Sequence, residues 1–203
     1  RMGSFASCKT MNGVGHHAMI KLIKRRPIID ANKVRKIGDG IFGRPQYKHL
    51  WESQAPTQQL VSRAKAHGLV PKGAPGLSKG ILEDTRENWE ELAIHYDLVF
   101  SPEILELARE ILLISIQQSF NKGYCDFDDQ IFLSACWGAA FDKFDNVLVD
   151  EAQDLSPIQH ILLRKSLKPG GRLMAVGDPN QAIYGWRGAT NDSISQLVEK
   201  FDM

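Results

Sequence analysis

Two consecutive carboxylates, Asp150 and Glu151, follow the mostly apolar stretch 146–149 (NVLV), and Asp178 follows a second apolar stretch at 173–176. Such runs are typical of parallel strands buried on both faces. Ligands of open α/β sheets bind at the carboxyl ends of the strands. Asp150 is suited to hold a hydrated Mg²⁺, and Glu151 to orient or deprotonate a water that attacks a γ-phosphate. The pair therefore predicts the metal-and-water half of an ATPase site.

An acidic pair after a strand also occurs as a helix N-cap or in a solvated turn. The segment that begins at Gly177 favours the catalytic interpretation. Its first residues, 177–180 (GDPN), are typical of a tight turn after a strand. Four chemically distinctive side chains follow in close order: Gln181, Tyr184, Trp186 and Arg187. A core segment has no need of this mixture.

The segments 150–154 (DEAQD) and 177–189 (GDPNQAIYGWRGA) resemble motifs II and III of the UvrD/Rep family of superfamily 1 DNA helicases. Both motifs match the family pattern at nearly every position. The resemblance implies that Asp150 binds Mg²⁺ and the nucleotide, and that Glu151 is the catalytic carboxylate. Gln153 would bridge motif II to motif III. Gln181 would take part in catalysis by contacting the γ-phosphate of ATP, and would report its loss to the DNA site.

The same resemblance assigns the aromatic and basic residues of motif III to single-stranded DNA. Tyr184, Trp186 and Arg187 would face the strand, with Trp186 as a stacking platform and Arg187 as a phosphate or base contact. Stacking tolerates any sequence, because every base has a π-face. An ordinary half-buried aromatic is the alternative for Trp186.

A third match lies at residues 125–135 (CDFDDQIFLSA), which resemble the family's DFxDLL segment. This segment opens a helix with acidic residues in its first turn. We therefore interpret Asp126 and Asp129 as structural caps or DNA-proximal polar groups and not as catalysts.

Residues 5–18 (FASCKTMNGVGHHA) resemble motif Ib of the same family. Thr10 and Asn12 would then contact the DNA backbone, and His16 would lie in the first turn of the helix that follows. A helix N-terminus explains Asn12 about as well.

The chain contains no G-x-x-x-x-G-K-[ST] loop, whose backbone N–H groups and lysine hold a nucleotide. The nearest imitation, residues 73–80 (GAPGLSKG), has Ser78 at the second glycine position and Gly80 in place of the hydroxyl residue. We interpret it as a flexible Pro/Gly loop. A second RecA-like domain with an arginine finger is also expected after motif III. With the chain running from Arg1 to Met203, we expect a fragment that alone hydrolyses ATP negligibly.

The composition, 203 residues with 43% hydrophobic content, suffices for one compact domain or a domain with an insertion. Cys8, Cys125 and Cys136 form no C-x-x-C pair, and the six histidines lack metal-ligand spacing, which argues against a disulfide framework or a zinc site. No apolar run approaches roughly 18 residues, and no signal peptide is visible. We expect a soluble cytoplasmic, nuclear or nucleoid-associated protein without membrane contact.

The net charge of +1 conceals an uneven distribution. Residues 1–36 hold nine basic side chains and one acidic one, Asp30, whereas residues 83–106 are strongly acidic. A basic end beside the motif Ib match suits salt-sensitive phosphate binding. The solvated face of a charged helix is the alternative.

Periodicity predicts helices near residues 15–24, 31–41, 57–67, 83–96 and 102–120. Ser101 and Pro102 supply the N-cap and first position of the last of these. Next come the DFDD helix, the motif II strand, a helix opened by Ser156 and Pro157, the motif III strand, and a helix from about Asn191. This alternation implies a parallel sheet.

We therefore expect an α/β fold: an incomplete RecA-like P-loop NTPase domain with a parallel sheet at residues 1–30 and 126–203, and a helical insertion subdomain at 31–125. The resemblance implies part of an ATP-dependent DNA helicase or translocase, with Mg²⁺ and ATP as cofactors, single-stranded DNA as partner and 3′→5′ movement. The alternative is a non-catalytic DNA-binding or interaction module that retains the fold. An upstream phosphate loop would decide between them.

Overall fold

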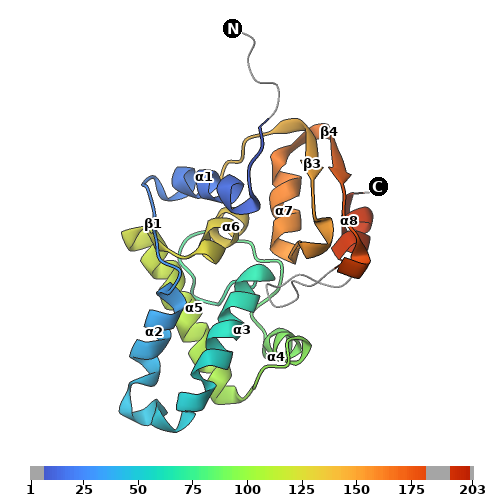
Figure 1. Ribbon diagram of the computed structural model, residues 1–203. Helices are drawn as coiled ribbons and strands as arrows, with labels where there is room; N and C mark the ends of the chain where they lie inside the picture. Colours follow the sequence, from blue (N-terminus) through green and yellow to red (C-terminus); the bar gives the residue numbers. More distant parts are fainter. Residues whose placement is uncertain (1–6, 182–192, 202–203) are drawn as a thin grey trace.

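The computed structural model describes residues 7–181 and 193–201 and has the expected α/β character, with helices predominating (Figure 1). Its helices are α1 (Met11–Ile23), α2 (Lys33–Phe42), α3 (Gln54–Ala66), α4 (Arg86–His95), α5 (Pro102–Lys122), α6 (Phe127–Cys136), α7 (Pro157–Ser166) and α8 (Ser193–Phe201). Its strands are β1 (Ile28–Ile29), β2 (Tyr124–Cys125), β3 (Phe144–Val149) and β4 (Leu167–Ala175). Three short 3₁₀ helices are η1 (Pro45–Ser53), η2 (Ala152–Asp154) and η3 (Pro179–Gln181). Within this described part, no helix is both long enough and apolar enough to cross a membrane.

Helix α1 begins four residues earlier than its apolar periodicity predicts. The cause is Thr10, whose Oγ1 accepts a hydrogen bond from the backbone N–H of Gly13 at 3.1 Å and so caps the helix at Met11. The expectation that His16 lies in the first turn is therefore wrong, because His16 is in the second turn. The cap still places the motif Ib residues at the start of α1.

Helix α5 is the central element of the helical region and packs against α2 and α3 (Figure 1). Its start follows the predicted chemistry, since Ser101 Oγ accepts from the N–H of Ile104 at 3.2 Å and Pro102 opens the first turn. Gly123 ends the helix at a left-handed φ of 68°. The apolar face of α5 lies in the main core, whose other members extend into α1, α6 and α7.

The short strands β1 and β2 pair in parallel, with Ile28 opposite Tyr124 and Ile29 opposite Cys125. The backbone N–H of Asp30 also donates to the carbonyl of Cys125 at 2.8 Å. Neither strand is predicted from the sequence pattern. Their pairing means that the chain enters the helical region and leaves it at adjacent points, which agrees with an insertion at 31–125. That domain division stays a prediction.

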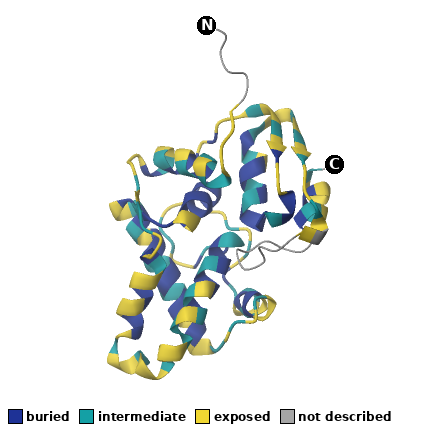
Figure 2. Ribbon diagram, viewed as in Figure 1, coloured by how far each residue is buried: buried dark blue, intermediate teal, exposed yellow. Residues whose placement is uncertain are grey.

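Strands β3 and β4 form a parallel pair joined by α7, as the alternation of patterns predicts. One face of the pair packs under α7 and α8, where Val149, Leu163 and Leu197 form a second, smaller core. The other face is open in the described part of the chain, where Leu148 is 74% exposed and Met174 59%. Much of β3 and β4 has the colours of exposed or intermediate residues in Figure 2. Among the described residues, β3 and β4 are therefore covered on one face only, and not buried as the sequence pattern predicts.

Residues 73–80, the nearest sequence to a phosphate loop, form an irregular segment and lead into no helix. The segment is held against the end of α6, because the indole N–H of Trp137 donates to the carbonyl of Pro75 at 2.7 Å and the N–H of Lys79 to that of Cys136 at 2.8 Å. A phosphate loop needs its backbone N–H groups at a helix N-terminus. The structure thus agrees with the loop interpretation.

Candidate ATPase and DNA-binding site

The two motif II carboxylates lie where β3 ends, at the carboxyl edge of the β3–β4 pair. Both residues are exposed, and Asp150 Oδ1 accepts from the backbone N–H of Glu151 at 3.0 Å. Glu151 has a left-handed backbone, with φ 53° and ψ 45°. A non-glycine residue in this region costs on the order of 1–3 kcal/mol and is held only by surrounding contacts. The turn therefore stores strain at the predicted catalytic residue.

Gln153 is the contact that holds this turn. Its Nε2 donates to Glu151 Oε2 at 2.7 Å, and its Oε1 accepts from the backbone N–H of Asp178 at 3.1 Å. The residue is 3% exposed, so both ends of the amide are used in a protected environment. One side chain thus joins the Glu151 carboxylate to the first turn of motif III.

The backbones of the two motifs are also hydrogen-bonded. The N–H of Val176 donates to the carbonyl of Val149 at 2.8 Å, and the N–H of Ala152 donates to the carbonyl of Val176 at 2.9 Å. Gly177 lies inside this junction. A Cβ there would collide with Gln153 Oε1 and would lie 2.9 Å from the Ala152 nitrogen. Glycine is therefore required for the close approach of motif III to motif II.

Gln181 lies at the end of η3, on the same edge, and its side chain is exposed. Its backbone N–H donates to the carbonyl of Asp178 at 2.9 Å, and its Nε2 donates to Asp178 Oδ2 at 2.9 Å. This amide is in reach of solvent and of a ligand. The other motif III residues singled out in the sequence, Tyr184, Trp186 and Arg187, lie outside the described residues.

The motif Ib residues both have intramolecular partners at the start of α1. Thr10 caps the helix, and Asn12 Nδ2 donates to the carbonyl of Phe127 at 2.8 Å. The second bond ties the N-terminus of α1 to the N-terminus of α6. Contact of either residue with DNA stays a prediction.

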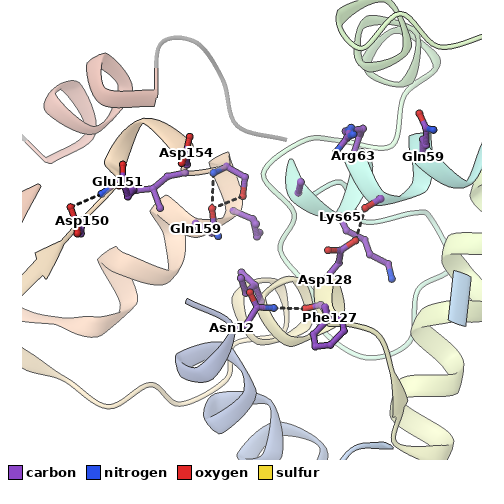
Figure 3. Close-up of a pocket in the computed structure, with 16 residues that line it drawn as sticks. Asn12, Gln59, Arg63, Lys65, Phe127, Asp128, Asp150, Glu151, Asp154 and Gln159 are labelled. Carbon is purple, nitrogen blue, oxygen red and sulfur yellow. Dashed lines mark hydrogen bonds between the residues drawn. The ribbon is translucent and has the colours of Figure 1, made fainter. Parts of the chain in front are cut away.

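A cleft of about 820 Å³ brings several of these residues together (Figure 3). Its volume is in the range of ligand-binding clefts. Motif II and the start of α7 form one wall, and α3 forms the opposite one. Residues at the starts of α1 and α6 line the space between the walls. The labelled lining residues are Asn12, Gln59, Arg63, Lys65, Phe127, Asp128, Asp150, Glu151, Asp154 and Gln159.

Comparison with known proteins identifies the family of this chain. The family model of the UvrD/REP helicase N-terminal domain matches residues 8–202. The chain belongs to the UvrD/Rep helicase family. DNA helicase II of Escherichia coli is 43% identical over 60 residues, which cover 30% of this chain and 8% of that protein.

Two further relatives match nearly the whole chain. ATP-dependent DNA helicase srs2 of Schizosaccharomyces pombe is 25% identical over 99% of this chain and 24% of its own length. A probable DNA helicase II homolog of Rickettsia conorii is 35% identical over 93% of the chain and 24% of its own length. The chain thus spans about a quarter or less of the length of these relatives.

The acidic residues at the start of α6 act as caps in this UvrD/Rep chain, as the sequence predicts. The N–H of Asp129 donates to Asp126 Oδ1 at 2.8 Å, and the N–H of Asp126 donates to Asp129 Oδ2 at 2.9 Å. This is a reciprocal capping box. No catalytic role is needed to explain either carboxylate.

Two buried lysines pair with this box, and neither is predicted from the sequence. Lys65 Nζ lies 2.5 Å from Asp126 Oδ2 and 2.8 Å from Asp129 Oδ1, and Lys33 Nζ lies 2.6 Å from Asp129 Oδ2. Both lysines are fully buried. Their positions offered one clue: Lys33 stands four residues before Ile37 on the apolar face of α2, and Lys65 four after Val61 on α3.

The network separates the pKa values of its two carboxylates. Burial and the neighbouring Asp129 charge raise the pKa of Asp126 to about 6. Burial also acts to raise the pKa of Asp129, but Lys65 and Lys33 outweigh it and lower that pKa to about 2. These four charges fix the start of α6, and with it Phe127 and Asp128, against α2 and α3.

Proposed function

We propose that this chain is the motif Ib to motif III portion of an ATP-dependent DNA helicase or translocase, in which ATP hydrolysis drives movement along single-stranded DNA. The observation that carries the proposal is the Gln153 amide, which hydrogen-bonds both the Glu151 carboxylate and the backbone of Asp178. Through these two hydrogen bonds, a change in the contacts of the Glu151 carboxylate would be transmitted to the backbone of motif III.

Glu151 would orient or deprotonate the water that attacks the γ-phosphate. General-base action requires a carboxylate in hydrogen-bond reach of the water, at the edge where the nucleotide binds. Glu151 is exposed to the cleft, and Gln153 holds one of its oxygens, which leaves the other oxygen for a water. Its strained backbone supports this role, because such strain concentrates at functional sites.

Asp150 would hold Mg²⁺ together with the phosphates of ATP. Mg²⁺ is usually bound by one or two carboxylates, several waters and substrate phosphates, and the exposed Asp150 carboxylate at the sheet edge fits that donor set. Among the described residues, no three His, Cys, Asp or Glu side chains gather into a metal cluster, so the phosphates and waters would complete the shell. Bound Mg²⁺ neutralises charge that develops on the phosphates.

Gln181 would contact the γ-phosphate and respond to its loss. Its amide donates to Asp178 in this structure and is exposed, so a phosphate oxygen can compete for the same donor. The backbone N–H of Asp178 donates to Gln153, and Gln153 in turn donates to Glu151. A change in the contacts of Gln181 with Asp178 would therefore be transmitted to the Glu151 carboxylate. Motif III continues into Tyr184, Trp186 and Arg187, which we propose as DNA contacts.

The DNA strand would also contact the start of α1. Thr10 and Asn12 lie at the N-terminus of α1, where backbone N–H groups attract phosphates. The exposed basic residues of the first 36, such as Lys9, Lys24 and Arg26, supply positive charge for a polyanionic partner, whereas Lys33 is buried.

The test is the Gln153→Ala variant in the intact helicase. We expect ATP affinity within a few-fold of the wild type, because Gln153 is not assigned to the nucleotide. We expect DNA to stimulate ATP turnover far less, since the link to motif III is gone. Gln159→Ala, which removes an amide from α7 on the same wall of the cleft, is the matched control. Full DNA stimulation in Gln153→Ala would contradict the proposal.

A further inference from the structure

A pocket of about 370 Å³ lies at the amino edge of the β3–β4 pair, where both strands begin. Its walls come from these strand starts and from the ends of α7 and α8, the helices beside the two strands in Figure 1. Because β3 has six residues, this edge lies roughly 20 Å from Asp150, which follows the strand. None of the roles proposed above uses this edge.

The pocket is lined by cations. Among its described lining residues, four are basic and none is acidic, the basic ones being Lys143, Arg164, Lys168 and Lys200. The Nζ of Lys200 lies 3.4 Å from His160 Nδ1, so this ammonium is engaged with α7. The cations that remain for a ligand are Lys143, Arg164 and Lys168.

Lys143 and Arg164 are held in place by backbone carbonyls. Lys143 Nζ donates to the carbonyl of Leu167 at 3.2 Å, and Arg164 Nη2 donates to the carbonyl of Lys200 at 2.7 Å. A neutral carbonyl does not cancel either charge. Because an ammonium and a guanidinium have several N–H donors each, both side chains keep donors for an anion.

Lys168 is presented at the pocket by an irregularity in β4. The pairing of β3 with β4 shifts register after Phe144 and Leu167, so that residues 168–171 bulge from β4. A Cβ at Gly171 would lie 3.0 Å from the carbonyl oxygen of Lys168 and 3.1 Å from that of Phe144, so glycine fits this tight turn. Bulges re-aim side chains, and this one directs an exposed lysine to the pocket.

The positive charge of this edge is only partly compensated within the described part of the chain. Asp145 accepts from Lys168 Nζ with both carboxylate oxygens, at 3.0 and 2.9 Å. Both side chains are exposed, and exposed ion pairs are weak, so a phosphate oxygen can replace this carboxylate. Burial lowers the pKa of Lys165, and the nearby charge of Lys143 acts in the same direction.

Basic residues at the ends of helices also have a purely structural explanation, since cations there interact favourably with the helix dipole. This accounts for Arg164, which lies in the last turn of α7. It does not account for Lys143, which precedes β3, or for Lys168 in the bulge of β4. These two lysines therefore distinguish a ligand site from helix capping.

More cations extend the same edge toward α1. Lys21 Nζ donates to Asp142 Oδ1 at 2.8 Å, and His17 Nε2 lies 3.6 Å from Asp142 Oδ2. Asp142 directly precedes Lys143, so the basic side chains form a row from α1 to the bulge. A row of spaced cations matches the repeating charges of a nucleic-acid backbone better than it matches a single anionic group.

The pocket offers phosphate contacts but little stacking surface. Phe201 is its aromatic lining residue, and this half-buried ring has the Arg164 guanidinium 5.7 Å from its centroid. Single strands are bound by grooves that combine positive charge with aromatic rings on which bases stack. Duplex DNA is held mainly through its phosphates. The chemistry of this edge is thus that of a duplex contact.

We infer that the amino edge of the β3–β4 pair binds the phosphate backbone of duplex DNA through Lys143, Arg164 and Lys168. The inference rests on the proposed function for the choice of DNA as the polyanion. It goes beyond that function by adding a duplex surface at the edge opposite motif II, outside the cleft.

The experiment measures binding of a short, blunt-ended, fluorescein-labelled duplex to the 203-residue chain by anisotropy, over a series of salt concentrations. We expect Lys143→Gln/Lys168→Gln to weaken duplex binding about tenfold or more at low salt. The slope of log affinity against log salt should become shallower by about 1.8, which is 0.9 for each lost phosphate contact. Both lysines are exposed, so the melting temperature should stay almost unchanged.

The matched control is Lys72→Gln/Lys79→Gln, which removes the same charge from two exposed lysines that do not line this pocket. It should leave duplex affinity and salt slope close to those of the wild type. Asp145→Asn provides an arm of opposite sign, because it frees Lys168 and removes a negative charge; we expect tighter duplex binding. Equal weakening in both lysine double variants would overturn the inference, as would a wild-type chain that does not bind the duplex.

A labelled oligothymidylate separates this inference from the proposed function. We expect Lys143→Gln/Lys168→Gln to bind it nearly as the wild type does, because the single-strand contacts proposed above lie elsewhere. A wild-type chain that binds the duplex but no oligothymidylate would contradict those single-strand contacts and not this inference.

A free oligophosphate is the other source of the same phosphate chemistry. In calorimetric titrations with sodium tripolyphosphate, we expect no saturable binding in the concentration range that saturates the chain with duplex. Saturable binding of tripolyphosphate that is tighter than duplex binding, and that Lys143→Gln/Lys168→Gln removes, would assign the pocket to a free oligophosphate and overturn the inference.

Discussion

Replacing Lys65 by methionine should destabilise the chain far more than a surface charge change does. Lys65 Nζ lies 2.5 Å from Asp126 Oδ2 and 2.8 Å from Asp129 Oδ1, and these two side chains are 7% and 0% exposed. Methionine fills a similar volume, so the cost is electrostatic: Asp126 loses its cation while it stays buried. Breaking a buried pair in this way costs about 3–5 kcal/mol. That is a large part of the roughly 5–15 kcal/mol that stabilises a domain.

The assay is urea unfolding at neutral pH, with the free energy of unfolding taken from the midpoint and slope. Lys168→Met is the control, since Lys168 and Asp145 form an exposed pair, 47% and 76% exposed, which is worth about 0–1 kcal/mol. Adding Asp126→Asn to Lys65→Met should recover part of the loss, because no unpaired charge then stays buried at that position. A Lys65→Met chain within about 1 kcal/mol of the wild type would refute this reasoning.

Three further outcomes are expected. The pKa of Asp126 is raised to about 6 from 3.8, so its contribution to the free energy of unfolding is present below pH 4 and is lost as the pH rises through 6. Urea unfolding at a series of pH values should show this dependence in the wild type and not in Asp126→Asn. Gly177→Ala should lower the free energy of unfolding by about 1–3 kcal/mol, because its Cβ meets Gln153 and Ala152; an unchanged urea midpoint would contradict this. Trp186→Ala should weaken single-strand binding by about 1–3 kcal/mol with an almost unchanged melting temperature, whereas a buried tryptophan would cost about 3–5 kcal/mol of stability.

Local chemistry made much of this fold predictable. Ser101 caps α5 through the N–H of Ile104, three residues later, and Pro102 opens the first turn. Asp126 and Asp129, also three apart, cap α6 reciprocally, so the sequence alone indicates where both helices begin. Local patterns also predict that β3 is followed by α7, which Ser156 caps, and then by β4. The start of α1 was misplaced because its glycines weaken the apolar pattern, while the cap at Thr10 determines the boundary.

The missed features depend on contacts between distant segments. Lys33 and Lys65 are buried because they meet Asp126 and Asp129, which lie 61 or more positions away, and no local pattern reports such a pairing. The strands were expected to be covered on both faces because their apolar runs are continuous. Leu148 and Met174 are exposed in the described part of the chain, and an apolar run does not itself encode which segment, if any, covers its second face.

At the site, the motif resemblance identified residues that do come together, and the geometry added the contacts between them. Asp150, Glu151 and Asn12 line one cleft, and Gln153 contacts both motifs. Arg63, which also lines the cleft, could not be found this way, because its contact with the Tyr96 ring joins two segments that are distant in the sequence.

The central claim, that Glu151 activates the hydrolytic water of a DNA-dependent ATPase, is tested most directly by Glu151→Gln in the intact helicase. The measurement is DNA-stimulated kcat alongside the Kd of ATP. Glutamine keeps the shape and removes the base, so we predict a Kd within a few-fold of the wild type and a kcat lower by orders of magnitude. A Glu151→Gln enzyme that keeps the wild-type kcat would contradict the account.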